Sequence, residues 1–112
     1  MSTFRVALAQ INTVVGDIQG NLEKILHSIA QSRSIEANLV AFPELAVPGY
    51  PPEDLLFKSS FVTANIKATH EIMSASNGIA TVVGFADRND NLYNAAALGY
   101  NSQMAGVYHK IH

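Results

Sequence analysis

The sequence predicts an α/β fold in which helices pack on a mixed sheet, with parallel strands first and antiparallel strands last. Two observations lead to this prediction. In residues 1–78, short apolar segments alternate with two longer segments of helical periodicity, and in residues 79–112 three strand-like segments are separated only by short turns. The expected order is strand, helix, strand, helix, strand, strand, strand, and no internal repeat or linker interrupts it.

The first half of the chain contains a strand, a helix and a second strand. Residues 4–11 (FRVALAQI) place large apolar side chains on one face and small alanines on the other, which suits a strand covered on both faces. A loop follows, in which Gly16 and Gly20 supply turns. Apolar residues then recur at i, i+3, i+4 and i+7, which predicts an amphipathic helix over residues 21–36. Residues 38–42 (NLVAF) form the second strand, which ends at a proline because proline lacks an amide hydrogen.

A loop rich in proline and glycine, residues 43–57, leads to the second helix. Ser59 or Ser60 is the expected cap at the start of this helix, because a serine hydroxyl accepts from a free backbone amide there. The Asn-Gly pair at 77–78 ends the helix with a residue suited to the left-handed conformation. Residues 79–87 (IATVVGFAD) form the third strand.

The last part of the chain reads as two consecutive hairpins. Residues 88–91 (RNDN) form a turn, residues 92–100 (LYNAAALGY) a strand, residues 101–103 (NSQ) a second turn, and residues 104–112 (MAGVYHKIH) a final strand. The sequence stops within this strand, and an open apolar sheet edge invites pairing with another chain.

The composition narrows the functional classes. Hydrophobic residues make up 48% of the 112 residues and charged residues only 14%, compared with roughly 25% charged in ordinary domains. This indicates a chain buried on more than one side, a homo-oligomer, or a piece of a larger fold. The net charge of −2 without a basic cluster argues against nucleic acid and anionic membranes as partners. No apolar run approaches the roughly 18 residues of a membrane span, so we expect a cytoplasmic protein.

The absence of cysteine excludes disulfides, cysteine metal sites and a cysteine nucleophile from these residues. The four histidines, His27, His70, His109 and His112, form no ligand pair at i, i+4 or across a turn. We therefore expect surface or hydrogen-bonded histidines and no metal site.

Glu44 is the first candidate for chemistry. It directly follows the second strand, and the functional groups of α/β sheets gather beyond the carboxyl ends of strands. At the mouth of an apolar pocket, desolvation would disfavour its charged form and make it a base. Pro48, Pro51 and Pro52 stiffen the loop that follows. The alternative is that Glu44 only caps the next turn or pairs with a cation.

Lys110 is the second candidate. It follows an apolar strand, where an ammonium group is costly unless it has a partner, and Glu44 is the obvious one. The alternative is a terminal lysine in solvent.

Glu53 and Asp54 are expected to open a helix rather than to bind a cation. Asn94, inside a strand, either orients the site or satisfies a bulge.

Four segments resemble the nitrilase superfamily of carbon-nitrogen hydrolases. They are residues 5–21 (RVALAQINTVVGDIQGN), 42–56 (FPELAVPGYPPEDLL), 93–97 (YNAAA) and 108–112 (YHKIH). Within the second segment, residues 49–56 (GYPPEDLL) resemble the glutamine-dependent NAD synthetase branch.

This resemblance implies a four-layer α-β-β-α sandwich, of which residues 1–112 are the N-terminal part of one glutaminase domain, with no second domain present. It also implies a Glu-Lys-Cys triad in which Glu44 is the general base and Lys110 stabilises the oxyanion. Tyr50 would line the glutamine pocket, although a tyrosine covering apolar surface is the commoner case. The cysteine lies further along such chains. Pro48 and the glycine-free turn at 101–103 depart from the family pattern.

For function, the resemblance implies an enzyme that hydrolyses glutamine and passes the ammonia to a second domain. That domain would use ATP and magnesium to amidate deamido-NAD to NAD, making the parent protein a carbon-nitrogen ligase. The present residues lack GxGxxG and P-loop patterns, so no cofactor is expected in them. Without a thiol the chain alone should be inactive. The alternatives are a stand-alone amidase or carbamoylase, and a non-catalytic truncated product that self-associates.

Overall fold

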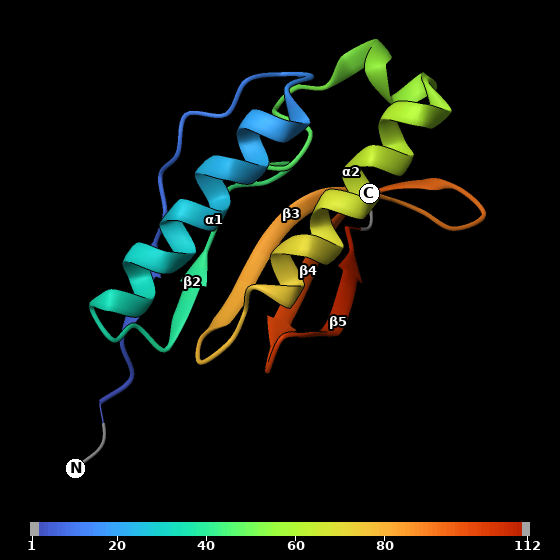
Figure 1. Ribbon diagram of the computed structural model, residues 1–112. Coiled ribbons are helices and arrows are strands. Elements are labelled where there is room, and N and C mark those ends of the chain that lie inside the picture. Colours follow the sequence, from blue (N-terminus) through green and yellow to red (C-terminus); the bar gives the residue numbers. More distant parts are fainter. Residues whose placement is uncertain (1–2, 111–112) are drawn as a thin grey trace.

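The computed structural model, which describes residues 3–110, has two layers, with both long helices on one face of a five-stranded sheet (Figure 1). The elements are β1 (Val6–Leu8), α1 (Ile18–Ser34), β2 (Leu39–Ala41), the 3-10 helix η1 (Glu53–Phe57), α2 (Ser59–Ser74), β3 (Ala80–Arg88), β4 (Leu92–Tyr100) and β5 (Gln103–His109). Apart from η1, this is the predicted order. No helix in this part of the chain combines the length and apolar character needed to cross a membrane.

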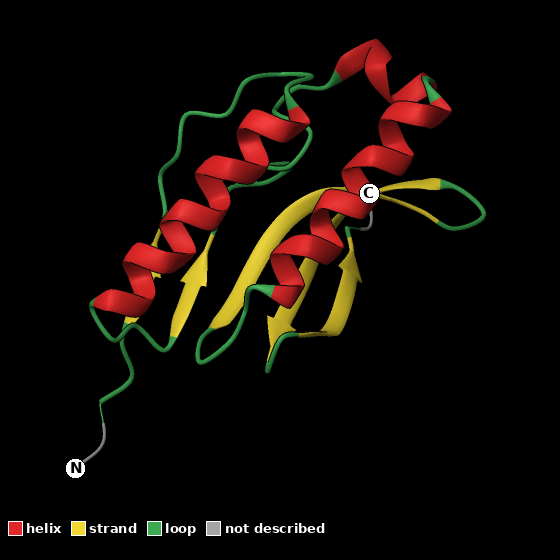
Figure 2. Ribbon diagram, in the orientation of Figure 1, coloured by secondary structure: helices red, strands yellow, loops and turns green. Residues whose placement is uncertain are grey.

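The sheet is mixed, as predicted. Strands β1, β2 and β3 are parallel, and β3, β4 and β5 form two antiparallel hairpins, so that the strands lie side by side in chain order (Figure 2). The parallel strands need a helical crossover between them, which α1 and α2 supply. The hairpins need only short turns.

The core lies between the helices and one face of the sheet. Val40, Val83 and Phe85 point from the strands into this core and are at most 2% exposed. On the opposite face, large apolar side chains of β1 remain exposed, Val6 by 48% and Leu8 by 78%. The prediction that the first strand is covered on both faces is therefore wrong for the described residues, because both helices pack on the same side. The structure corresponds to two of the four layers that the resemblance implies.

Helix α1 begins earlier than predicted because Asp17 caps it. The Asp17 carboxylate accepts from the Gly20 amide at 2.9 Å, which satisfies one of the free donors of the first turn. Gly20 thus lies inside the helix and not in a turn, whereas Gly16, with φ of +85°, does form one. The helix ends two residues before the predicted end because Glu36 adopts a left-handed φ of 60°.

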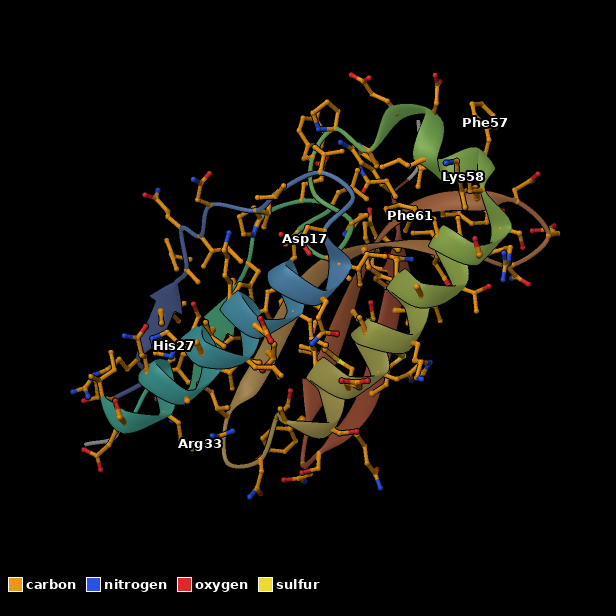
Figure 3. The ribbon with its side chains drawn as sticks, turned by 45° about the horizontal axis from the view of Figure 1, so that its top comes forward. Asp17, His27, Arg33, Phe57, Lys58 and Phe61 are labelled. Atoms are coloured by element: carbon orange, nitrogen blue, oxygen red, sulfur yellow. The ribbon has the colours of Figure 1, made fainter. Side chains whose placement is uncertain are left out.

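The predicted serine cap of α2 is wrong. The capping position is Lys58, in extended conformation and without a side-chain cap (Figure 3). Only this residue separates η1 from α2, so Ser59 already belongs to the helix, and its hydroxyl accepts from the Arg88 guanidinium at 3.2 Å. The helix ends before the predicted Asn-Gly pair, although Gly78 does have a left-handed φ of +75°.

The far ends of the two helices are joined by one arginine. Arg33, near the end of α1, donates to the carbonyl oxygen of Asn77 at 2.8 Å and to that of Ala75 at 2.5 Å (Figure 3). Both acceptors lie in the loop that follows α2. The arginine therefore satisfies carbonyl groups that the end of a helix leaves free.

The second hairpin turn has no glycine but keeps a tight geometry. Asn101 and Ser102 both have positive φ, 53° and 62°, as a two-residue hairpin turn requires, and asparagine tolerates this conformation. The pairing of β4 with β5 shifts register between Leu98 and Gly99, which marks a β-bulge. Residues 111–112 of the predicted last strand lie outside the described residues.

Candidate active site

Glu44 sits in a turn that is pressed against β3. The loop after β2 runs along this strand, and the Val47 amide donates to the Gly84 carbonyl oxygen at 3.1 Å. A Cβ on Gly84 would lie 2.4 Å from the Leu45 nitrogen and 2.7 Å from the Pro43 oxygen. Only glycine permits this approach of backbone to backbone. The sequence analysis missed Gly84, although a glycine inside an apolar strand is the relevant signal.

Burial holds the turn in place. Leu45 has a left-handed φ of 49°, a costly conformation for leucine, yet its side chain is only 7% exposed. Ala46 and Val47 are buried beside it, at 1% and 0%. The apolar run after Glu44 thus anchors the turn in the core and leaves the carboxylate at its surface.

A buried asparagine ties the loop to the N-terminal segment. Asn21, on α1, is fully buried; its side-chain amide donates to the carbonyl oxygens of Val14 at 2.9 Å and Val47 at 3.0 Å and accepts from the Val14 amide at 2.8 Å. Close by, the Gly16 amide donates to the Pro48 oxygen at 3.0 Å. These hydrogen bonds fix the path of the loop around Pro48, the residue that departs from the family pattern.

Lys110 reaches Glu44 from the end of β5. Its Nζ lies 3.2 Å from Glu44 Oε2, although 66 positions separate the two residues. Its backbone amide donates to the Asn94 oxygen at 2.8 Å, which extends the pairing of β4 and β5. The structure thus contains the ion pair that the sequence predicts. The side chains of Lys110 and Glu44 remain 49% and 48% exposed, so the expected desolvation of Glu44 is not seen within these residues.

The pair borders a pocket of about 390 Å³ on the sheet face that the helices leave open. Apolar and small residues form most of its wall, and Glu44, Lys110 and Asn94 supply the polar groups. The lining residues are Phe42, Pro43, Glu44, Val82, Gly84, Asn94, Ala95, Ala96, Tyr108 and Lys110. A mostly apolar wall with a few polar groups is typical of a site for a small molecule.

The pocket is lined by a different tyrosine from the one that the sequence analysis named. Tyr50 is 62% exposed and does not line this pocket, so its predicted role in binding has no contact to support it here. Tyr108, which the sequence analysis passed over, does line it. Alternation along β5 was the available signal, because Tyr108 and Lys110 are two residues apart and share a face.

No histidine among residues 3–110 lines the pocket. His27 and His70 are exposed on the helices, as Figure 3 shows for His27 on α1. His109 bonds to Asp87, and His112 lies outside the described residues. Residues 3–110 contain no group of three or more His, Cys, Asp or Glu side chains that could hold a metal ion.

The acidic pair behaves as predicted. Glu53 and Asp54 form the first turn of η1, where carboxylates are favourable at a helix start.

Residues 5–112 match the model of the carbon-nitrogen hydrolase family. The chain belongs to this family. The predicted membership of the nitrilase superfamily is thereby confirmed. The glutamine-dependent NAD(+) synthetase of Thermotoga maritima is 39% identical over 113 residues, which cover 99% of this chain and 20% of the relative.

Solved structures agree with this assignment. The glutamine-dependent NAD+ synthetase of Acinetobacter baumannii superposes with a TM-score of 0.90 at 36% identity, covering 97% of this chain and 21% of that chain. An amidase from Nesterenkonia sp. shares the fold, with a TM-score of 0.88 at 24% identity, covering 97% of this chain and 43% of that chain. The present chain therefore spans about a fifth of the length of the curated relatives it matches.

Proposed function

We propose that these residues form the N-terminal part of the glutamine-hydrolysing domain of a glutamine-dependent NAD synthetase. The observation that carries the proposal is the Glu44–Lys110 pair, with 3.2 Å between its charged atoms, at the edge of a largely apolar pocket. The similarity of nearly the whole chain to proteins named glutamine-dependent NAD synthetase supports the choice of substrate.

In the proposed reaction, Glu44 and Lys110 act on a cysteine supplied by residues beyond this chain, which has none. Glu44 takes the proton of the thiol, and the sulfur attacks the carbonyl carbon of the glutamine side-chain amide. Lys110 donates a hydrogen bond to the oxygen that becomes negatively charged. When the carbon-nitrogen bond breaks, the proton goes from Glu44 to the departing ammonia, and water then hydrolyses the thioester.

The open face of the sheet fits this division of roles. The two charged groups come from different segments, the turn after β2 and the end of β5, and lie next to each other on the pocket wall. An amide placed in the pocket would therefore meet a base and a hydrogen-bond donor side by side. Asn94, which also lines the pocket, offers an additional amide for orientation. By themselves these residues bind and orient an amide, and we expect no hydrolysis without the thiol.

The remaining parts of the proposal concern the parent protein. Its second domain would receive the ammonia and, with ATP and magnesium, convert deamido-NAD to NAD. We propose no nucleotide site within the present residues. A cytoplasmic location and a homo-oligomeric state complete the proposal.

The test uses the complete reading frame that encodes these residues. Glutamine hydrolysis and NAD formation are measured with either glutamine or ammonia as nitrogen source. Glu44→Gln should abolish glutamine hydrolysis while ammonia-dependent NAD formation persists, and the exposed Glu23→Gln on α1 serves as the control. Equal loss of both activities would contradict the role of Glu44. Amide hydrolysis without any NAD formation would favour a stand-alone amidase. A reading frame without a cysteine would favour a non-catalytic product.

A further inference from the structure

Strand β5 brings Lys110 to the site, yet it is weakly anchored. Within residues 3–110 it is an edge strand that pairs only with β4, and five of its seven residues are exposed. Its two partly buried residues are Met104, which packs against the core, and His109, next to Lys110. The placement of Lys110 thus depends on few side-chain contacts.

The register of β5 contains one extra residue. From the hairpin turn, Gly99 pairs with Met104, but Leu98 then pairs with Gly106, so that Ala105 has no partner. Because side chains alternate between the two faces of a sheet, an extra residue reverses the face of every residue after it. The bulge therefore decides which way the end of β5 points.

With the bulge, His109 pairs with Ala95 and faces the helices, and Lys110 projects from the open face to Glu44. Without it, the register set by the turn would pair His109 with Asn94. Lys110 would then point to the helix-covered face, away from Glu44. A slip of a single residue would separate the pair.

A three-residue cluster across β3, β4 and β5 favours the bulged register. His109 Nε2 lies 2.7 Å from Asp87 Oδ2, and the His109 ring stacks on Tyr93 with 4.2 Å between centroids and 6° between planes. Asp87 and Tyr93 are themselves cross-strand partners. The side chains of His109 and Asp87 are 29% and 22% exposed, so this contact is better shielded from water than the Glu44–Lys110 pair. The slipped register would lose both contacts.

We propose that His109 is a positioning residue for Lys110: its contacts with Asp87 and Tyr93 fix the register of β5 and so direct the Lys110 ammonium to Glu44. Its effect on catalysis rests on the proposed function, whereas the register does not. The two parts are therefore tested separately.

The register is tested in this chain, whose lack of cysteine makes engineered pairs unambiguous. Ala97→Cys with Val107→Cys joins direct partners in the observed register. Ala96→Cys with Val107→Cys would join direct partners only in the slipped register. A disulfide needs Cα atoms within about 7 Å and facing side chains, so each pair reports one register. Disulfide formation under mild oxidation is followed by mass spectrometry.

With His109 intact, only the first pair should oxidise. In the His109→Ala background the second pair should also oxidise, whereas the exposed His27→Ala on α1 should change nothing. Asp87→Ala should resemble His109→Ala, and Tyr93→Phe, which keeps the stacked ring, should resemble the native chain. Exclusive oxidation of the first pair in folded His109→Ala would overturn the proposal. So would global unfolding of that variant by circular dichroism, because the proposal assigns His109 to one edge strand and not to the core.

The catalytic part is tested in the complete reading frame. His109→Ala should lower kcat for glutamine hydrolysis by roughly 10-fold or more, with little change in KM, because a misplaced Lys110 weakens transition-state contacts. Ammonia-dependent NAD formation should be unaffected. An unchanged kcat would contradict the positioning role. If the unmodified protein hydrolyses no glutamine, the proposed function fails, while the disulfide experiment still decides the register.

Discussion

The two members of the Glu44–Lys110 pair are held by opposite means. Glu44 stands on a loop whose neighbours are buried and hydrogen-bonded to α1 and β3. Lys110 follows an exposed edge strand fixed by one bulge and one small cluster. The core itself therefore places Glu44, and we expect the position of this carboxylate to be lost when the core unfolds. The cation is placed by local contacts, and can be displaced in a folded molecule.

The largest effect should come from the approach of the loop to β3. Gly84→Ala places a Cβ 2.4 Å from the Leu45 nitrogen and 2.7 Å from the Pro43 oxygen, and these backbone atoms must move. We expect a loss of about 3 kcal/mol in the free energy of unfolding, at the upper end for overpacking. Gly106→Ala, where a Cβ meets nothing within 4 Å, is the control and should be nearly neutral. Urea denaturation measures the free energy of unfolding of both variants. Equal stability of the two would contradict the inference that the close approach of the loop to β3 holds Glu44 in place.

Removal of the buried asparagine should be next. Asn21→Ala removes the acceptor of the Val14 amide and the side-chain donor to the Val47 carbonyl oxygen, whose bond is buried, and we expect a cost of about 2 kcal/mol. The Val14 carbonyl oxygen still accepts from the Asp17 amide. Gln31→Ala, an exposed position on the same helix, should cost little. The measurement is again the free energy of unfolding. A loss at Asn21 no larger than at Gln31 would show that the loop is held without this bond.

A smaller effect is expected at the start of α1. Asp17→Ala removes the cap that accepts from the Gly20 amide and should cost about 1 kcal/mol. Asp17→Asn keeps an accepting oxygen and should retain most of the stability. Thermal unfolding of both variants checks this, and an identical drop in Tm for the two would argue that charge, and not the hydrogen bond, is what matters.

The smallest effect should come from the ion pair itself. Glu44→Gln, Lys110→Met and the double variant form a cycle whose coupling energy we expect to be below about 1 kcal/mol, because both side chains are half exposed. The coupling should fall further with added salt. A coupling above about 2 kcal/mol would mean that Lys110 is held by the pair and not by β5, contrary to the comparison.

The sequence was informative where a single pattern decides the structure. The limits of β4, residues 92–100, were predicted correctly from period-two alternation between two turns. The pairing of Lys110 with Glu44 followed from the cost of an isolated ammonium group on an apolar strand. Both predictions rest on the types of residues that are adjacent in the sequence.

It was uninformative where the outcome depends on tertiary contacts. The bulge at Leu98/Gly99 has strand glycines beside it, Gly99 and Gly106, but glycine alone does not fix the register, and alternation on either side of the bulge looks regular. The need for glycine at position 84 appears only once the loop lies across β3. The exposure of Tyr50 depends on the path of the loop over residues 43–57, which contains four prolines. Sequence spacing alone does not reveal which residues this loop contacts.

The strand order also bears on how the site is assembled as the polypeptide is made. Within residues 3–110 each strand pairs with the strands next to it in sequence, so the sheet can grow by one strand at a time during translation. The turn that carries Glu44 has its anchoring contacts once β3 has left the ribosome, since these come from α1 and β3. Lys110 emerges later, after β4 and β5. A nascent chain thus carries a fully supported carboxylate before its cationic partner exists.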